Sequence, residues 1–223
     1  MLLLAVDTSG KHGSIALAQC GPEDACEVIE VAPLTGGTFS AELVPQIAAL
    51  LDKYEFGKAD IGGLAVVSGP GSFTGLRIGL AVIKALAEVL AKPIAAVSML
   101  EAVASSGPSR GRVTAALDGG RNEVFLGEYE VDGAVMQMTR ETLLTRQQWL
   151  ESASGRVIVT PDRSLAEAAR AKGLHVVEVE RPRSDAIARL GWRKMVAGVT
   201  VSAEALEANY IGRSEAELFV KGG

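Results

Sequence analysis

The sequence predicts an α/β fold of two lobes, each a mixed sheet flanked by helices, with the second lobe reduced in size. Two observations predict it. Short apolar runs typical of buried strands alternate with longer segments whose apolar residues recur at helical spacing. In addition, an apolar strand that ends in aspartate, followed by a polar turn and a second strand, opens each half of the chain. This internal echo favours two lobes of related topology.

The elements of the first half follow from pattern. The apolar runs at 2–6 and 14–18 flank a polar turn, which predicts a hairpin. Ser40 precedes apolar residues at helical spacing and is the expected N-cap of a helix over about 41–52. A short strand at 64–67 leads into a glycine-rich segment and then a helix over about 75–91, which Pro93 ends. Two further strands are expected at 27–31 and 94–97.

The second half opens after the Ser/Gly/Pro-rich stretch at 105–109, which is the expected lobe boundary. We therefore expect a first lobe over 1–104, completed by the segment 200–223, and a second lobe over 105–199. The expected elements of the second half are strands at 113–117, 123–129, 134–138 and 157–159 and helices at 146–152, 165–172 and 186–196.

Composition narrows the function classes. The chain has 223 residues, a formal net charge of −5 at pH 7 and 48% hydrophobic residues, which excludes a disordered chain. Proteins that hold nucleic acid unaided usually have a basic excess, because phosphate contacts dominate the affinity. Independent nucleic-acid binding is therefore disfavoured. A basic cluster within 181–194 (Arg181, Arg183, Arg189, Arg193 and Lys194) favours a solvated helix face, with an RNA contact inside a larger complex as the alternative.

Targeting and redox signals point to the cytoplasm. Cys20 and Cys26 match neither a redox CxxC nor a zinc pattern, so two free thiols are expected. The first residues lack a basic region and reach Asp7 after a short apolar run, unlike a signal peptide. The most apolar stretch, 78–90, is short and contains charges, so we expect no contact with a membrane.

The most specific segment is Gly-Pro-Gly-Ser-Phe-Thr-Gly at 69–75, which lies between a strand and a helix. Glycines let backbone amides approach an anion, and a helix N-terminus adds partial positive charge, so Gly69, Gly71, Ser72 and Thr74 are candidates for a phosphate loop. The segment lacks the lysine of a P-loop. The alternative is a sharp turn whose glycines allow a strand and a helix to pack tightly, and the sequence does not decide between the two.

Two hairpin tips are further phosphate-site candidates. Asp7, Thr8 and Ser9 form the first, and Asp118 with Gly119 forms the second, in the other half. Turn stabilisation by Asp and Ser is the alternative for each tip taken alone. Metal and hydrolytic chemistry are not expected, because His12 and His175 are the only histidines, are far apart and lie beside no recognisable nucleophile. We predict no catalytic residue and no metal ligand.

The segment 69–79 resembles the signature of the bacterial TsaB (YeaZ) family, whose members are partner subunits in making threonylcarbamoyladenosine (t6A) in tRNA. The resemblance extends over nearly the whole chain. It includes Ala-Val-Asp-Thr-Ser at 5–9, the first-helix residues Ser40, Glu42, Leu43 and Pro45, the strand end at 97–100, the segments 123–125 and 128–129, and the tail residues 209–211, 213 and 215–217. Thr-Pro-Asp at 160–162 departs from the glycine-rich turn common in relatives.

The resemblance implies an actin-like/sugar-kinase-like (ASKHA) fold and a non-catalytic scaffold that activates the catalytic paralogue TsaD. In TsaD, two histidines hold a metal at positions that here are Met99 and Val103, and neither can replace a histidine ligand. The family also implies the small ATPase TsaE as a partner, a homodimer when the chain is alone, and tRNA contact only through the complex. No cofactor of its own is expected, with ATP or ADP at the interface with partners.

The family's partner surface consists of its first two long helices, here about 41–52 and 75–91. On this basis the expected interface residues are Leu43, Ile47, Leu76, Gly79, Ile83 and Leu86. Two alternatives stay open. A stand-alone ATP-dependent kinase or ATPase of the same fold would need a working adenosine loop, which the sequence does not show. A metallopeptidase would need ligands that the sequence lacks.

Overall fold

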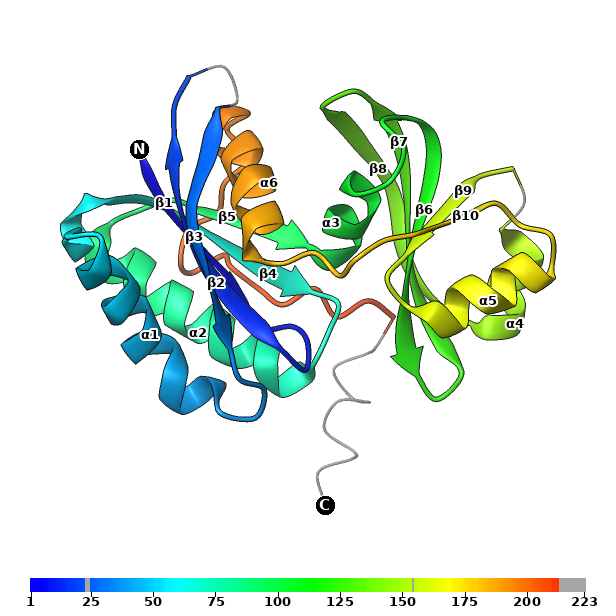
Figure 1. Ribbon diagram of the computed structural model, residues 1–223, viewed down its shortest axis with the longest axis horizontal. Coiled ribbons are helices and arrows are strands. Elements are labelled where there is room, and N and C mark those ends of the chain that lie inside the picture. The colour runs from blue at the N-terminus through cyan, green and yellow to red at the C-terminus, as the bar shows by residue number, and fades with distance from the viewer. Residues whose placement is uncertain (23–24, 154, 213–223) are drawn as a thin grey trace. The chain divides into compact units, whose positions relative to one another are not determined.

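The computed structural model describes residues 1–22, 25–153 and 155–212, and the chain divides into two compact units (Figure 1). Unit 1 comprises Met1–Met99 and Pro182–Ala208. Unit 2 comprises Leu100–Arg181 and a segment that begins at Asn209. Each unit has its own five-stranded sheet. None of the helices in the described ranges has the length and apolar character needed to span a bilayer.

Unit 1 has a mixed sheet with strand order β3-β2-β1-β4-β5. Strands β1 to β3 are antiparallel neighbours, whereas β4 runs parallel to β1 and β5 parallel to β4. Its elements are β1 (Leu2–Asp7), β2 (Gly13–Cys20), β3 (Cys26–Leu34), α1 (Phe39–Lys53), η1 (Lys58–Asp60), β4 (Ile61–Gly69), α2 (Phe73–Leu90), β5 (Ile94–Ser98) and α6 (Ser184–Val196).

Helices cover both faces of this sheet. Figure 1 shows α1 and α2 side by side on one face and α6 on the other. Every residue of β1 is buried as a result, so β1 is a continuous apolar run up to Asp7 instead of an alternating one. The main core lies between the sheet and the α1–α2 layer, where Leu43, Ile47 and Ile83 are buried with the sheet residues Leu4 and Val66.

Unit 2 repeats this topology. Its sheet has the order β10-β9-β6-β7-β8, with β6 to β8 antiparallel and with β9 and β10 in parallel register with β6 and β9. Helices α4 and α5 cover one face of the sheet and α3 lies on the other (Figure 1). The elements are α3 (Met99–Ser105), β6 (Arg110–Gly120), β7 (Glu123–Asp132), β8 (Val135–Thr145), α4 (Arg146–Ser152), β9 (Val157–Thr160), α5 (Arg163–Ala171) and β10 (Val176–Glu178).

The strand–Asp–turn–strand pattern that opens each half of the sequence therefore corresponds to a repeat of topology in the structure. In each unit the central strand has an aspartate at or near its end, Asp7 in β1 and Asp118 in β6. This strand forms an antiparallel hairpin with the next strand and has a parallel strand on its other side. The two-lobed α/β fold with mixed sheets is confirmed.

The lobe boundaries differ from the expected ones. Helix α6 lies within the expected second lobe, 105–199, yet it packs on the sheet of unit 1. The cause is a contact distant in sequence: Gly191 faces Ala65 so closely that a Cβ on this glycine would lie 2.5 Å from the Ala65 Cβ. Val201 then bridges to Ile94 in unit 1, whereas the chain from Asn209 belongs to unit 2. The predicted tail positions 213 and 215–217 lie outside the described residues.

Two helix starts also differ. Helix α1 begins at Phe39 with Thr38 in the cap position, so the predicted N-cap role of Ser40 is wrong. Helix α2 begins at Phe73 instead of 75, because the Ser72 hydroxyl accepts a hydrogen bond from the Gly75 N–H and caps the helix there.

The two cysteines lie opposite each other in the β2–β3 hairpin. Cys20 and Cys26 are register partners, and the Cys20 thiol donates a hydrogen bond to the Cys26 sulfur across 3.0 Å. This hydrogen bond and then burial raise the pKa of the Cys20 thiol. Cα atoms of directly opposed strand residues are separated by roughly 4.5–5.5 Å, a range that a disulfide tolerates.

We expect the oxidant diamide to join Cys20 and Cys26 within one chain. Cys26 reacts first, because the raised pKa keeps Cys20 protonated and the thiolate is the nucleophile. The two thiols lose two hydrogens and two electrons to diamide, which becomes a hydrazine. Intact-mass spectrometry should show a monomer lighter by two hydrogens, and Cys26→Ser should not form it. Exclusively intermolecular disulfides would contradict the expected pairing.

Candidate functional site

The first candidate site is the turn after β1. Asp7, Thr8 and Ser9 are all buried, at 3%, 2% and 2% exposure. Both the N–H and the hydroxyl of Ser9 donate to Asp7 Oδ1, at 2.8 and 2.6 Å. The Asp7 carboxylate thus holds its own turn in place, as aspartate commonly does two residues before a backbone amide.

The glycine-rich segment packs directly on this turn. The Ser72 N–H donates to the Ser9 carbonyl at 2.7 Å, and the Thr8 hydroxyl donates to the Gly75 carbonyl at 2.7 Å. The sequence placed these two motifs more than sixty residues apart, and the parallel pairing of β1 with β4 brings their ends together. The turn and the segment therefore form one hydrogen-bonded cluster in unit 1.

The glycines are required for this close approach. A Cβ on Gly71 would lie 2.4 Å from the Ser9 carbonyl oxygen, and one on Gly75 would lie 2.0 Å from the Thr8 carbonyl oxygen. On the next helical turn, a Cβ on Gly79 would meet the Thr8 hydroxyl at 2.3 Å. At Gly69 the backbone has φ +138°, a conformation that side chains disfavour. Of the two alternatives for this segment, tight packing is the one that the contacts support.

Several donors of the cluster are already used within the protein. An anion cradle needs backbone amides and hydroxyls that point outward and are free to donate. Here the amides of Ser9, Ser72 and Gly75 and the hydroxyls of Thr8 and Ser9 all donate within the protein. Thr74 is exposed on the first turn of α2. We therefore derive no step through a nucleotide bound at this cluster.

The second candidate, the tip of the β6–β7 hairpin, is closed by internal bonds as well. The Gly120 N–H donates to Asp118 Oδ1 at 2.9 Å, and the Asp118 N–H donates to Asp162 Oδ2 at 2.7 Å. Gly119 packs against the backbone of Glu123. Sequence reasoning treated Asp162 as a departure from a glycine-rich turn. In the structure it connects the end of β9 to the hairpin tip.

The predicted interface residues require a correction. Leu43, Ile47, Leu76 and Ile83 are between 0% and 5% exposed. Leu43, Ile47 and Ile83 belong to the core between α1, α2 and the sheet. Gly79 is buried against Thr8, and Leu86 is half-buried. Helical periodicity identified the apolar faces correctly, but those faces pack on this chain's own sheet.

The outer face of α1 and α2 is lined by other side chains. Val44 on α1 and Val89 on α2 are 56% and 76% exposed. Small residues, Ala48, Ala81 and Ala85, are exposed on the same two helices. We call this set the α1–α2 outer face. The expected interface residues did not include Val44 or Val89.

The positions that resemble metal ligands of TsaD are fully buried apolar side chains. Met99 and Val103 both lie in α3 and are 0% exposed. Across the described residues, no group of three or more His, Cys, Asp or Glu side chains has a geometry that could hold a metal ion.

Comparison with known proteins agrees with the fold. The family model described as TsaD, tRNA N6-adenosine threonylcarbamoyltransferase, matches residues 33–198. The tRNA threonylcarbamoyladenosine biosynthesis protein TsaB of Bacillus subtilis is 30% identical over 97% of this chain and 96% of its own length. Its counterpart in Haemophilus influenzae is 31% identical over 70% of this chain and 64% of its own length. The solved structure of YeaZ from Pseudomonas aeruginosa has a TM-score of 0.75 at 26% identity and covers 94% of this chain and 99% of that one.

The repeated β-sheet topology defines the class of this protein, a two-lobed protein of the ASKHA fold. Within that class, the chain belongs to the TsaB (YeaZ) family. The resemblance on which the sequence analysis relied is confirmed.

Proposed function

We propose that this chain acts in tRNA threonylcarbamoyladenosine formation as a non-catalytic scaffold that binds and activates the catalytic paralogue TsaD. The observation that carries the proposal is similarity over nearly the full length to a protein named for t6A biosynthesis, at 30% identity. The closed turn–loop cluster supports a scaffold over a stand-alone kinase, because a kinase needs those donors for phosphate.

The α1–α2 outer face is the proposed contact surface for TsaD. Exposed valines on a helix pair lower the free energy when a partner covers them, because apolar surface leaves water. The alanines between them let a partner helix approach closely. In the absence of TsaD, the same face pairs two copies of this chain as a homodimer.

Other members of the complex supply the remaining functions in this proposal. ATP or ADP binds at the interface with partners, TsaE among them, where another subunit provides the phosphate donors. The net charge of −5 fits tRNA contact through the complex. One solved relative is described as similar to the peptidase YEAZ. The buried apolar residues Met99 and Val103 give this chain no support for metallopeptidase chemistry.

Light scattering on a size-exclusion column tests the proposal. The chain alone should elute as a homodimer, and addition of TsaD from the same organism should convert it to a one-to-one heterodimer. The conversion is expected because both complexes use the α1–α2 outer face and exclude each other. A chain whose elution is unchanged by TsaD would refute the scaffold role, and calorimetric ATP binding by the chain alone would favour the kinase.

A further inference from the structure

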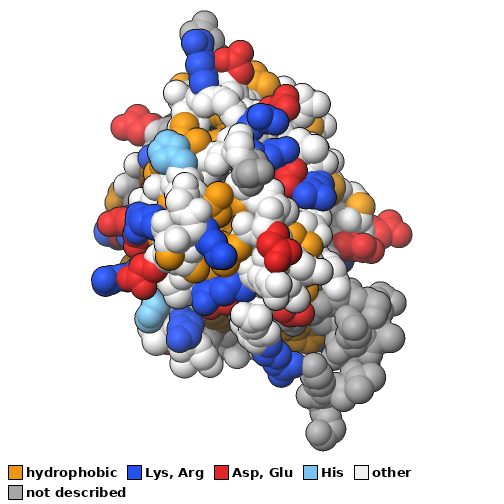
Figure 2. Space-filling model, turned by 90° about the vertical axis from the view of Figure 1, so that its right-hand side faces the viewer, with side chains coloured by type: hydrophobic (Ala, Val, Ile, Leu, Met, Phe, Trp, Pro, Cys, Tyr) orange, Lys and Arg blue, Asp and Glu red, His pale blue; other side chains and the backbone are white. Residues whose placement is uncertain are grey.

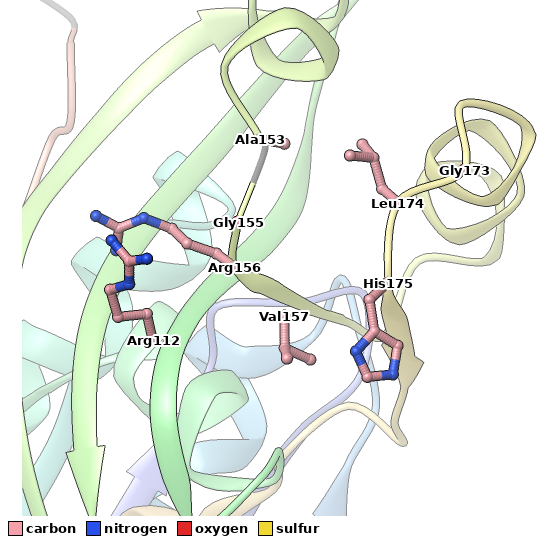
Figure 3. A pocket seen from close by; sticks show the side chains of 8 residues that line it. All are labelled: Arg112, Ala153, Gly155, Arg156, Val157, Gly173, Leu174 and His175. Atoms are coloured by element: carbon pink, nitrogen blue, oxygen red, sulfur yellow. The ribbon is translucent and has the colours of Figure 1, made fainter.

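A cavity of about 550 Å³ lies in unit 2, away from the tip of the β6–β7 hairpin. It is at the edge of the sheet where the parallel strands β6, β9 and β10 begin. Asp118, near the end of β6, and Asp162, just after β9, lie at the opposite edge. Its volume is within the range of small-molecule pockets. The lining residues are Arg112, Ala153, Gly155, Arg156, Val157, Gly173, Leu174 and His175 (Figure 3).

Two arginines, Arg112 and Arg156, lie next to each other on one side of this cavity because of the register between β6 and β9. Thr114 of β6 and Ile158 of β9 are register partners, and Arg112 and Arg156 lie two residues before them. Because side chains alternate along a strand, the two arginines share a face of the sheet and are neighbours. Figure 3 shows their side chains pointing toward one another, with His175 on the other side of the cavity. Like charges on adjacent strands repel unless an anion lies between them.

The carboxylates nearby do not neutralise this pair. Glu128 is shared: its Oε2 binds Arg156 Nη2 at 3.1 Å and its Oε1 binds Arg140 Nη2 at 2.7 Å. Arg112 makes no ion pair with any described residue, although Glu130 is its register partner on β7. Glu128 therefore pairs with Arg140 and Arg156, and Arg112 is left without an ion pair among the described residues.

Arg156 also has an unsatisfied donor. Its side chain is only 21% exposed, and its Nη1 is buried without a hydrogen-bond partner among the described residues. A buried donor left unpaired costs roughly 1–3 kcal/mol, and more on a charged group. A ligand that draws the guanidinium toward the cavity would remove that cost.

We propose that this cavity binds a small molecule through a phosphate group held by Arg112 and Arg156, with His175 as a third contact. A phosphate carries close to two negative charges, and its oxygens accept paired N–H bonds from guanidinium groups. A carboxylate would balance only one of the two arginines. Figure 2 shows basic and acidic side chains interspersed over this face of unit 2, so the specificity comes from local geometry and not from a broad positive field.

Pyrophosphate is the probe, and the two histidines of the chain give the readout. The proton NMR signals of the His175 ring should shift on titration, while those of exposed His12 in unit 1 should not. Calorimetry should give binding in roughly the millimolar range or tighter. Arg112→Gln should weaken pyrophosphate binding at least about tenfold, because one of the two guanidinium groups that pair with the phosphate is lost. Arg112 is exposed, so circular dichroism should show an intact fold.

Arg163→Gln is the matched control, because Arg163 is an exposed arginine of the same unit that pairs with Glu167 outside the cavity. It should bind pyrophosphate as the parent chain does. Equal binding by Arg112→Gln and the parent, or a titration without a His175 shift, would overturn the proposal. A short RNA oligonucleotide that shifts His175 when pyrophosphate does not would overturn it in favour of a contact with a polymer.

Discussion

Gly75→Ala should destabilise unit 1 by about 3 kcal/mol or more, the largest stability loss expected for so small a change. In an ordinary helix interior this substitution stabilises by roughly 0.5–1 kcal/mol. Here the new methyl group would lie 2.0 Å from the Thr8 carbonyl oxygen, which is backbone and cannot rotate away. The helix would have to retreat, which breaks the Thr8–Gly75 hydrogen bond and the contact between the Ser72 N–H and Ser9.

Urea denaturation followed by circular dichroism measures this loss. Gly57→Ala is the matched control, because Gly57 is exposed and a Cβ there would meet nothing closer than 3.4 Å. It should change the free energy of unfolding by less than about 1 kcal/mol. An unchanged denaturation midpoint for Gly75→Ala would show that the turn–loop cluster does not have the close packing described above.

Val44→Glu combined with Val89→Glu should abolish both the proposed TsaD complex and the proposed homodimer while the chain stays folded. Both valines are exposed, so the carboxylates are hydrated in the free chain and cost little there. In a complex they would be buried in an apolar contact without a partner charge, which costs several kcal/mol. The dissociation constant for TsaD should rise by at least about a hundredfold, measured by calorimetry or light scattering.

Val135→Glu is the control for this variant. Val135 is 70% exposed on β8 of unit 2, so it matches Val44 and Val89 in type and exposure but lies off the α1–α2 outer face. It should bind TsaD normally. Full TsaD binding by the double variant would exclude the α1–α2 outer face. The core residues Leu76 and Ile83 are unsuitable for this experiment, because a charge at either position would unfold unit 1.

The sequence determined the elements and the family. Apolar runs and helical spacing identified most of the strands and helices. This works because the buried face of an element needs apolar residues at the spacing of that element, and the spacing is visible in the sequence. The repeated strand–Asp–turn–strand unit predicted two lobes of the same topology, and the sheet orders confirm it. The segment 69–79 indicated the TsaB family, which the comparisons show.

Only the tertiary structure decided which surfaces and donors are available. Gly71 and Gly75 fit a phosphate loop and a packed turn equally well until the contacts with Ser9 and Thr8 are seen. Leu76 and Ile83 lie on an apolar helix face, but periodicity does not say whether that face meets the chain's own sheet or a partner. The Arg112–Arg156 pair arises from the register of two strands more than forty residues apart in sequence. Each depends on pairings between distant segments, which local sequence patterns do not encode.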